Sequence, residues 1–300
     1  MNWLRKIRPL PHEWFFGAFL LVTWLRLLAA VGPLDPNALL YLALIVINSA
    51  LIVWCEARDT RPRWYARLWY YPIVINVVFM NMGSTALKVV SQRRDALLQQ
   101  FDAALAGVTP SLRAQAIVTP WLTETLSFCY LLFFPYLFIS WAFYAWRGVS
   151  SFRRLSVGLF TIYAFGFFGY SMVPAAGPYL AMADQFTVPL AGWAITRLNA
   201  SIVASGSNGV DVFPSLHCAV SCFLLFFDRR HARRRFWIYV APCVGLWLAT
   251  IYLRYHYLVD VIAGFALAAF ALWLTARWER YAGESAREPV SHNSATSPQP

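Results

Sequence analysis

The chain has 300 residues, of which 59% are hydrophobic and only 13% are charged. A soluble domain carries about 25% charged residues, so this composition excludes a soluble globular protein and predicts an all-α, polytopic membrane helical bundle. The net charge of +11 comes from 25 basic and 14 acidic residues. Because the arginines cluster between apolar runs, they favour loops that face anionic lipid over a nucleic-acid partner.

Eight apolar runs follow one another along the chain, most of them near the roughly 20 residues that cross the hydrocarbon of a bilayer. They occupy residues 14–31, 38–55, 68–87, 121–146, 155–173, 213–227, 236–253 and 257–276. The sequence therefore predicts about eight transmembrane helices. The five cysteines lie in or beside these runs and form no Cys-x-x-Cys pair, so neither a disulfide framework nor a zinc site is expected.

Two of the connecting segments are long. Residues 88–119 mix charged residues with alanines and leucines, and the apolar positions between Ala96 and Leu105 are spaced as in an amphipathic helix at the membrane interface. Residues 174–212 are poor in charge and are expected to form a long loop.

Basic residues lie at alternate ends of the apolar runs. The segments before the first run and after the second, fourth, sixth and eighth are the basic ones, and residues 228–235 are the densest cluster. The positive-inside rule then predicts cytoplasmic N- and C-termini. The opposite face, periplasmic or lumenal, receives residues 32–37, 88–119, 174–212 and 254–256. A bacterial inner membrane is the expected location.

Two histidines lie at the outer ends of apolar runs. His217 lies near the start of the sixth run, and His256 immediately precedes the eighth, with Asp260 four residues further on. On a helix that spacing would put His256 and Asp260 on one face. A neutral imidazole can attack phosphorus, a carboxylate can orient it, and a second histidine can protonate the leaving oxygen. The pattern predicts phosphoryl transfer at the membrane surface.

Anionic oxygens in such a reaction need hydrogen-bond donors and positive charge. Candidate phosphate-binding residues lie on the same predicted face: Ser215, Arg254, Lys88, Arg93 and Arg94. Each also has a structural interpretation. Ser215 can cap a helix, Arg254 can anchor the chain at the interface, and the other three can face lipid headgroups.

The segments Phe-Pro-Ser-Leu-His at 213–217 and His-Tyr-Leu-Val-Asp at 256–260 resemble the second and third motifs of the type 2 phosphatidic acid phosphatase (PAP2) superfamily. Together with Pro-Ala-Ala-Gly-Pro at 174–178, they look most like its inositol phosphorylceramide synthase branch. The resemblance extends over residues 68–276 and implies a six-helix core. It also implies His256 as nucleophile, Asp260 as its partner, His217 as the acid for the leaving group, and no metal or other cofactor.

The sequence departs from the phosphatase pattern at three positions. Leu216 stands where the second motif usually has glycine, and Thr250 stands where the third motif usually has arginine. Lys88 is not followed by Arg-Pro seven residues on, because Asp95 occupies that place. These departures favour the phosphotransferase branch and leave the phosphate-binding residues unassigned.

The expected organisation is a transmembrane hairpin at residues 1–58, a PAP2-like catalytic membrane domain at 59–280 and a disordered cytoplasmic tail at 281–300. The expected substrates are a membrane phospholipid donor and a lipid alcohol acceptor. Water as the acceptor would make the protein a phosphatase of phosphatidic acid or isoprenoid phosphates. Two further functions fit the same residues: a metalloenzyme with His217, His256 and Asp260 as ligands, and a non-catalytic membrane scaffold or transporter. The sequence does not identify protein partners.

Overall fold

A computed structural model describes residues 9–285 of the chain. The helices in this part are α1 Pro11–Val31, α2 Pro36–Glu56, α3 Arg61–Val89, α4 Asp95–Ala106, α5 Pro110–Arg113, α6 Pro120–Leu131, α7 Phe133–Trp146, α8 Val149–Met172, α9 Pro178–Ala181, α10 Ala194–Gly206, α11 Leu216–His231, α12 Arg233–Tyr252 and α13 Leu258–Ser285, with short 3₁₀ turns at Ala114–Ile117 and Ala183–Gln185. Within residues 9–285 the only strand-like pairing is one isolated bridge between Ala175 and Asp211.

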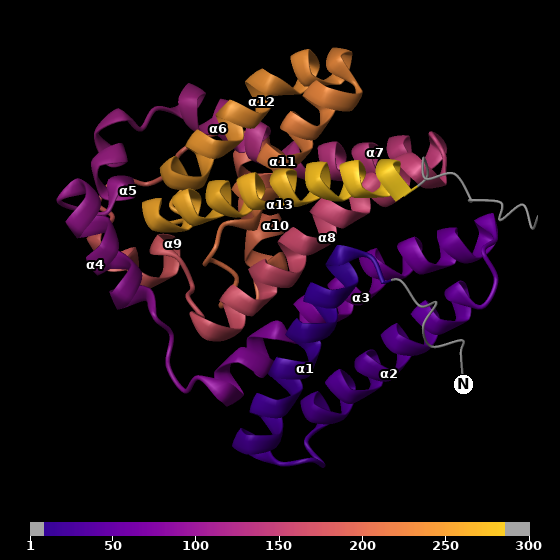
Figure 1. Ribbon diagram of the computed structural model, residues 1–300. Coiled ribbons are helices and arrows are strands. Elements are labelled where there is room, and N and C mark those ends of the chain that lie inside the picture. Colours follow the sequence, from indigo (N-terminus) through magenta and orange to yellow (C-terminus); the bar gives the residue numbers. More distant parts are fainter. Residues whose placement is uncertain (1–8, 286–300) are drawn as a thin grey trace, which may run out of the picture.

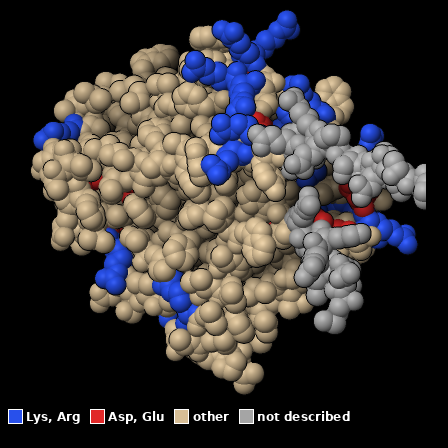
Figure 2. Space-filling model, in the orientation of Figure 1, with Lys and Arg blue, Asp and Glu red and all other residues tan. Residues whose placement is uncertain are grey.

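The structure confirms an all-α polytopic membrane bundle. Among the described residues, seven helical segments are long and apolar enough to cross a membrane, with α6 and α7 together forming one of them. The predicted sixth span corresponds to α11, which has 16 residues and is therefore shorter than the roughly 20 residues that cross the hydrocarbon. Figure 2 shows a broad surface without Lys, Arg, Asp or Glu between charged groups near the edges of the view.

Helix α8 is the centre of the bundle. Of its membrane-spanning window, 72% is buried, against 28–39% for the other candidate spans. It packs against α1, α3, α7, α11 and α13, and these helices surround it in Figure 1. The same view places α4, α5 and α9 together at one end of the bundle.

The three N-terminal helices are joined by buried charge. Arg67 of α3 binds Glu13 of α1 at 2.5 Å and Glu56 of α2 at 2.7 Å. Arg67 and Glu13 are both excluded from solvent, so loss of one partner would leave a buried charge uncompensated. This ion-pair cluster fixes α1 and α2 to the helix that follows them. The domain division at residue 58 stays a prediction.

The structure differs from the predicted elements in two places. The segment 174–212 is not one loop, because α10 lies within it. The first turn of α10 is capped from α6, where the Glu124 carboxylate accepts the N–H groups of Trp193, Ile195 and Thr196 at 2.7–3.1 Å. Because the capping residue lies about 70 residues away in the sequence, no local sequence pattern marks the start of α10. In the predicted tail, α13 continues to Ser285, and residues 286–300 lie outside the described part.

Candidate active site

The two motif histidines lie side by side. His217 is in the first turn of α11, and His256 lies in the segment that joins α12 to α13. Their ring centroids are 5.8 Å apart, with an angle of 61° between the ring planes. The structure thus brings together two residues that are 39 positions apart in the sequence, and both reach the site from the same end of their helices.

The start of α11 is built from the Phe-Pro-Ser-Leu-His motif at residues 213–217. Ser215 is the N-cap, and its hydroxyl oxygen accepts the N–H of Cys218 at 3.3 Å. Its own N–H donates to the carbonyl oxygen of Asp260 at 3.0 Å, which ties the two motifs together. Gly264 allows this close approach, because a Cβ atom there would lie 2.6 Å from the Ser215 carbonyl oxygen.

His256 precedes its helix, which corrects the expectation that it shares a helical face with Asp260. Helix α12 ends at Tyr252, and Arg254 has φ +68°, a left-handed conformation that reverses the chain. The N–H groups of Tyr255 and His256 then both donate to the Thr250 carbonyl oxygen at 3.0 Å. The left-handed residue is an arginine, so the sequence carried no glycine to mark this helix end.

Asp260 still lies next to His256. Its Oδ2 is 3.6 Å from His256 Nδ1 and accepts the N–H of Tyr257 at 2.8 Å. The two side chains are 3% and 0% exposed. Neither His256 Nδ1 nor Asp260 Oδ1 has a hydrogen-bond partner among the residues that the structure describes. As placed, the carboxylate caps the start of α13 and acts on the imidazole electrostatically.

The surroundings keep the imidazoles in an apolar environment. Burial lowers the pKa of His256 to about 4, against the opposing effect of the negative charge on Asp211. His256 is therefore neutral at physiological pH, which is the form that can act as a nucleophile. His217 stacks on Tyr130, with ring centroids 4.6 Å apart, and lies equally close to Phe133.

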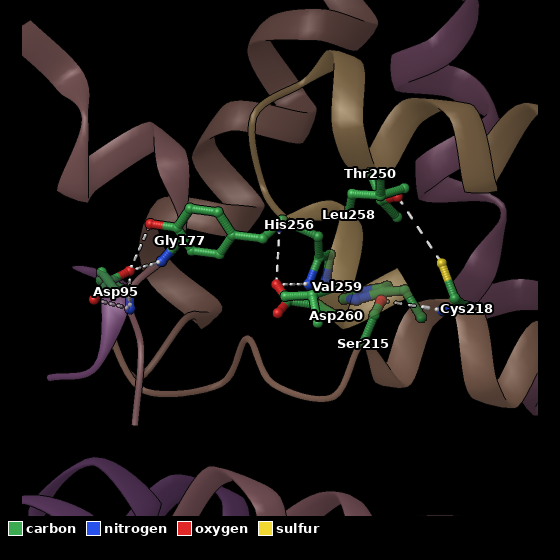
Figure 3. A network of polar contacts seen from close by, with 12 residues as sticks. Asp95, Gly177, Ser215, Cys218, Thr250, His256, Leu258, Val259 and Asp260 are labelled. Atoms are coloured by element: carbon green, nitrogen blue, oxygen red, sulfur yellow. Dashed lines mark hydrogen bonds and ion pairs between the residues drawn. The ribbon is translucent and has the colours of Figure 1, made fainter. Parts of the chain in front are cut away.

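Two carboxylates of α4 hold the segment around His256, and Figure 3 labels one of them, Asp95, with its contact to Gly177. Asp102 accepts the N–H groups of Leu258 and Val259, at 3.1 and 3.0 Å. Asp95 accepts the hydroxyl of Tyr257 at 3.0 Å and the backbone N–H groups of residues 176 and 177 at 2.9–3.1 Å. The sequence did not indicate these roles of Asp95 and Asp102, since the groups that the two carboxylates bind lie far away in the chain.

A cavity of about 330 Å³ extends from His217 into the bundle. Asp211 and His217 line one end, and mostly apolar and aromatic side chains of α3, α7, α8 and α10 line the rest, down to Leu159 and Trp141. The lining residues Tyr170 and Leu159 are eleven residues apart on α8, which corresponds to a depth of about 16 Å at 1.5 Å per residue. A long apolar chamber with a polar end suits a hydrocarbon tail joined to a polar headgroup.

The candidate phosphate-binding residues differ in burial and in distance from the cavity. Ser215 is buried and uses its hydroxyl oxygen in the α11 cap. Arg93 is exposed, and its guanidinium lies over Gly209, where a Cβ atom would be 2.8 Å from Nη2. Gly209 is two residues from Asp211, so Arg93 stands beside the loop that leads into the cavity. Its assignment as a phosphate ligand stays a prediction.

The other three basic residues have partners elsewhere. The Lys88 ammonium binds both carboxylate oxygens of Asp35 at 2.7 and 2.8 Å. Arg94 is exposed, and its backbone N–H donates to the Pro174 carbonyl oxygen at 2.7 Å. Arg254 donates to the Val188 carbonyl oxygen and stacks over the ring of Phe186 at 4.1 Å. The side-chain contacts give Lys88 and Arg254 a structural role, whereas the contact of Arg94 is made by its backbone, and phosphate binding by these three residues stays a prediction.

Within residues 9–285, no group of three or more His, Cys, Asp or Glu side chains is arranged to hold a metal ion. His217 at the polar end of the cavity and the adjacent His256 offer two imidazoles, with the buried carboxylate of Asp260 next to His256. Such a pair can support covalent phosphoryl transfer with acid assistance.

Comparison with protein families gives a match to the PAP2 superfamily model over residues 97–274. A search of curated proteins and a search of solved structures give no match. The matched segment runs from α4 to α13 and includes both histidine motifs, Asp102 of α4 and most of the cavity lining. This chain, an integral membrane protein with chemistry of the lipid phosphate type, belongs to the PAP2 superfamily.

Proposed function

We propose that this protein is a lipid phosphotransferase that moves a phosphoryl headgroup between membrane lipids through a phosphohistidine at His256, as in inositol phosphorylceramide synthases. One observation carries the proposal. The imidazoles of His217, in the first turn of α11, and His256, just before α13, have centroids 5.8 Å apart, and His217 lines the polar end of an apolar cavity. A site open to the periplasmic or lumenal face, with cytoplasmic termini, is part of the proposal.

In the first step the neutral imidazole of His256 attacks phosphorus. A P–N bond forms, the P–O bond to the donor alcohol breaks, and the departing oxygen takes a proton from His217. The negative charge of the bound phosphate favours the imidazolium form of His217 that this step needs. Asp260 stabilises the positive charge that develops on His256.

The second step reverses the roles. The hydroxyl oxygen of the acceptor lipid attacks phosphorus, the P–N bond breaks, and the hydroxyl proton passes to His217. Water in place of the acceptor alcohol gives hydrolysis, which is the second candidate function. The choice depends on which hydroxyl reaches the phosphohistidine.

A headgroup-transfer assay separates the two functions. Purified protein in vesicles is given labelled phosphatidylinositol, phosphatidic acid or an isoprenoid phosphate, with and without ceramide or diacylglycerol. We expect label to move to the lipid alcohol when it is present. Release of label only to water, at a rate that the alcohols do not change, would replace the transferase by the phosphatase.

Asp211 provides an electrostatic test of the donor class. It lines the cavity end beside His217, and its carboxylate accepts the Ser207 hydroxyl at 2.8 Å. A phosphomonoester carries about −1.5 to −2 charges at neutral pH, whereas a phosphodiester carries one, so the carboxylate disfavours the monoester more. We expect Asp211→Asn to raise kcat/KM for phosphatidic acid about tenfold relative to phosphatidylinositol, which is about 1.4 kcal/mol, or roughly a third of the ~4 kcal/mol of a charge pair at about 4 Å and an effective dielectric constant of about 20.

The matched control for this substitution is Asp184→Asn, because Asp184 is exposed and does not line the cavity. We expect it to leave the ratio of the two kcat/KM values unchanged. Equal changes for both substrates in the Asp211→Asn enzyme would show that the Asp211 charge does not select between them.

The apolar cavity predicts a dependence on chain length. Leu159 lies at the deep end and is 2% exposed, so Leu159→Trp fills the space that the end of a long tail would enter. We expect KM for long-chain donors to rise about tenfold, while KM for donors with short chains stays within about twofold, because each CH₂ denied burial costs about 0.8 kcal/mol.

Phe165→Trp on the same helix is the control, since Phe165 is 37% exposed on the bundle surface. Leu159→Ala provides the opposite change and should accept longer tails. Equal loss for short and long chains in the Leu159→Trp enzyme would mean that the tail does not occupy this cavity.

A further inference from the structure

Helix α4 turns two carboxylates toward the protein and a stripe of large apolar side chains away from it. The face that packs on the protein carries Asp95 and Asp102, which are 7% and 0% exposed. The outward stripe consists of Leu97, Phe101 and Leu105, spaced four residues apart and 41%, 50% and 58% exposed. A helix with carboxylates inward and large apolar side chains outward is stable only if something apolar covers its outer stripe.

The depth of α4 identifies what covers that stripe. Asp102 binds the N–H groups of Leu258 and Val259, the first residues of the last membrane span. At its other end, α4 begins six residues after Val89, where the third span ends. The helix is thus held at the level where two spans leave the hydrocarbon, which is the headgroup region of one leaflet. Figure 1 places it at the edge of the bundle.

The inward face of α4 holds the nucleophile segment. Asp102 fixes the two residues that follow Tyr257, and Asp95 binds the Tyr257 hydroxyl. His256 immediately precedes Tyr257. Asp95 also binds Gly177, which has φ +88° and packs so closely that a Cβ atom would lie 2.6 Å from the Tyr255 carbonyl oxygen. The helix therefore braces the chain on both sides of His256 (Figure 3).

We propose that α4 is a membrane-surface helix that positions the nucleophile: its apolar stripe lies in the headgroup region of a bilayer, and Asp95 and Asp102 transmit that placement to the His256 segment. The two aspartates are positioning residues, since they touch the loop and not the phosphate. Lipid contact then keeps His256 aligned with His217, and loss of that contact loosens the loop. The activity readouts rest on the proposed function, whereas the depth measurement described next does not.

The depth of α4 can be measured without any activity. Spin labels on Phe101→Cys and, as the control, Gln100→Cys are compared in vesicles of phosphatidylcholine and phosphatidylglycerol, against labelled wild-type protein. We expect oxygen to relax the label at position 101 more than a water-soluble nickel chelate does, and the reverse at position 100, which is exposed and polar. Stronger relaxation by the chelate at position 101 would overturn the proposal.

The functional link is tested on the full chain with the triple variant Leu97→Gln/Phe101→Gln/Leu105→Gln and with Gln100→Ser as the matched control. In vesicles we expect the triple variant to lose headgroup transfer about tenfold, because a displacement near 1 Å in a catalytic group costs up to about a hundredfold. A water-soluble short-chain phosphate assayed in detergent should be turned over within about twofold of wild type. An undiminished rate in vesicles would overturn the link between lipid contact and catalysis.

The positioning role is tested with Asp102→Asn, which keeps the side-chain shape but places an NH₂ group against two N–H donors. We expect kcat to fall roughly tenfold to a hundredfold with KM within about twofold, in vesicles and in detergent alike. Asp102→Glu, which restores the acceptor charge, should recover part of kcat. A rise in KM with unchanged kcat, or a lower Tm that accounts for the whole loss, would contradict a positioning role. Absence of transfer by wild-type protein would refute the proposed function and leave the depth result standing.

Discussion

Replacement of His256 by alanine is expected to abolish phosphoenzyme formation and to lower headgroup transfer on the order of 10⁴-fold or more, the scale seen when a covalent nucleophile is removed. The reason is that the imidazole itself forms the bond to phosphorus in the proposed reaction. The neutral ring faces His217 at 5.8 Å, with Asp260 next to it. The measurement is acid-labile, base-stable radiolabel on the protein after rapid quenching with a labelled donor, together with the steady-state transfer rate.

The matched control is His231→Gln. His231 lies at the other end of α11, where its ring binds the Phe227 carbonyl oxygen and Glu279. That substitution should leave labelling and transfer within about threefold, the effect of losing one partly exposed ion pair. Added imidazole, which can occupy the space left at position 256, should restore part of the donor cleavage by the alanine variant. Full labelling of the His256→Ala protein would place the phosphoryl group on another residue.

The elements set by local sequence were predictable. Runs of about 20 apolar residues identify spans whatever the tertiary structure, because the bilayer requires that length. The start of α11 also follows from local signals, since Ser215 caps the helix that it precedes. The candidate site could also be identified from the sequence, because a histidine at the end of a membrane span is confined to one membrane surface.

Contacts that depend on distant partners could not be predicted. Glu124 starts α10 across 71 residues, and Asp102 caps α13 across 156. Lys88 illustrates the same limit, because its charge suggested a phosphate ligand and its carboxylate partner, Asp35, lies 53 residues earlier. A charged residue in a membrane protein has few possible partners, but the sequence does not state which one the fold brings near.

Helix α3 contributes to the cavity that leads to the candidate active site. Its wall includes Pro72, Ile75 and Phe79 of α3, which precede the segment 97–274 that matches the superfamily model. Asn208, in the loop before Asp211, also donates to the Phe79 carbonyl oxygen at 3.0 Å. Helix α3, outside the matched segment, thus shapes the cavity and anchors the loop at its mouth. If a lipid tail enters the cavity as proposed, its selection depends in part on residues that the family motifs do not contain.

Replacement of His217 by glutamine is expected to lower transfer from natural phospholipids by about 10²–10⁴-fold, the contribution of a general acid, and to spare substrates that need no acid. An alkoxide leaving group must be protonated as the P–O bond breaks, whereas nitrophenolate leaves without a proton. A short-chain lipid with a p-nitrophenyl phosphodiester should therefore be cleaved by the variant within about tenfold of wild type. The measurement is the pre-steady-state release of nitrophenolate beside the rate of phosphoenzyme formation from phosphatidylinositol.

Tyr130→Phe is the control for a change in the surroundings of the His217 side chain that leaves its imidazole in place. It removes the hydroxyl that lies 3.4 Å from His217 Nδ1 and keeps the aromatic stack on the imidazole. This variant should show one common, small loss for both leaving groups. A His217→Gln enzyme that loses both substrates equally would assign His217 to phosphate binding or to structure, and the proton would have to come from another group. Selective loss of the natural substrate would identify His217 as the acid, because only a proton donor distinguishes an alkoxide from a nitrophenolate at the same phosphorus.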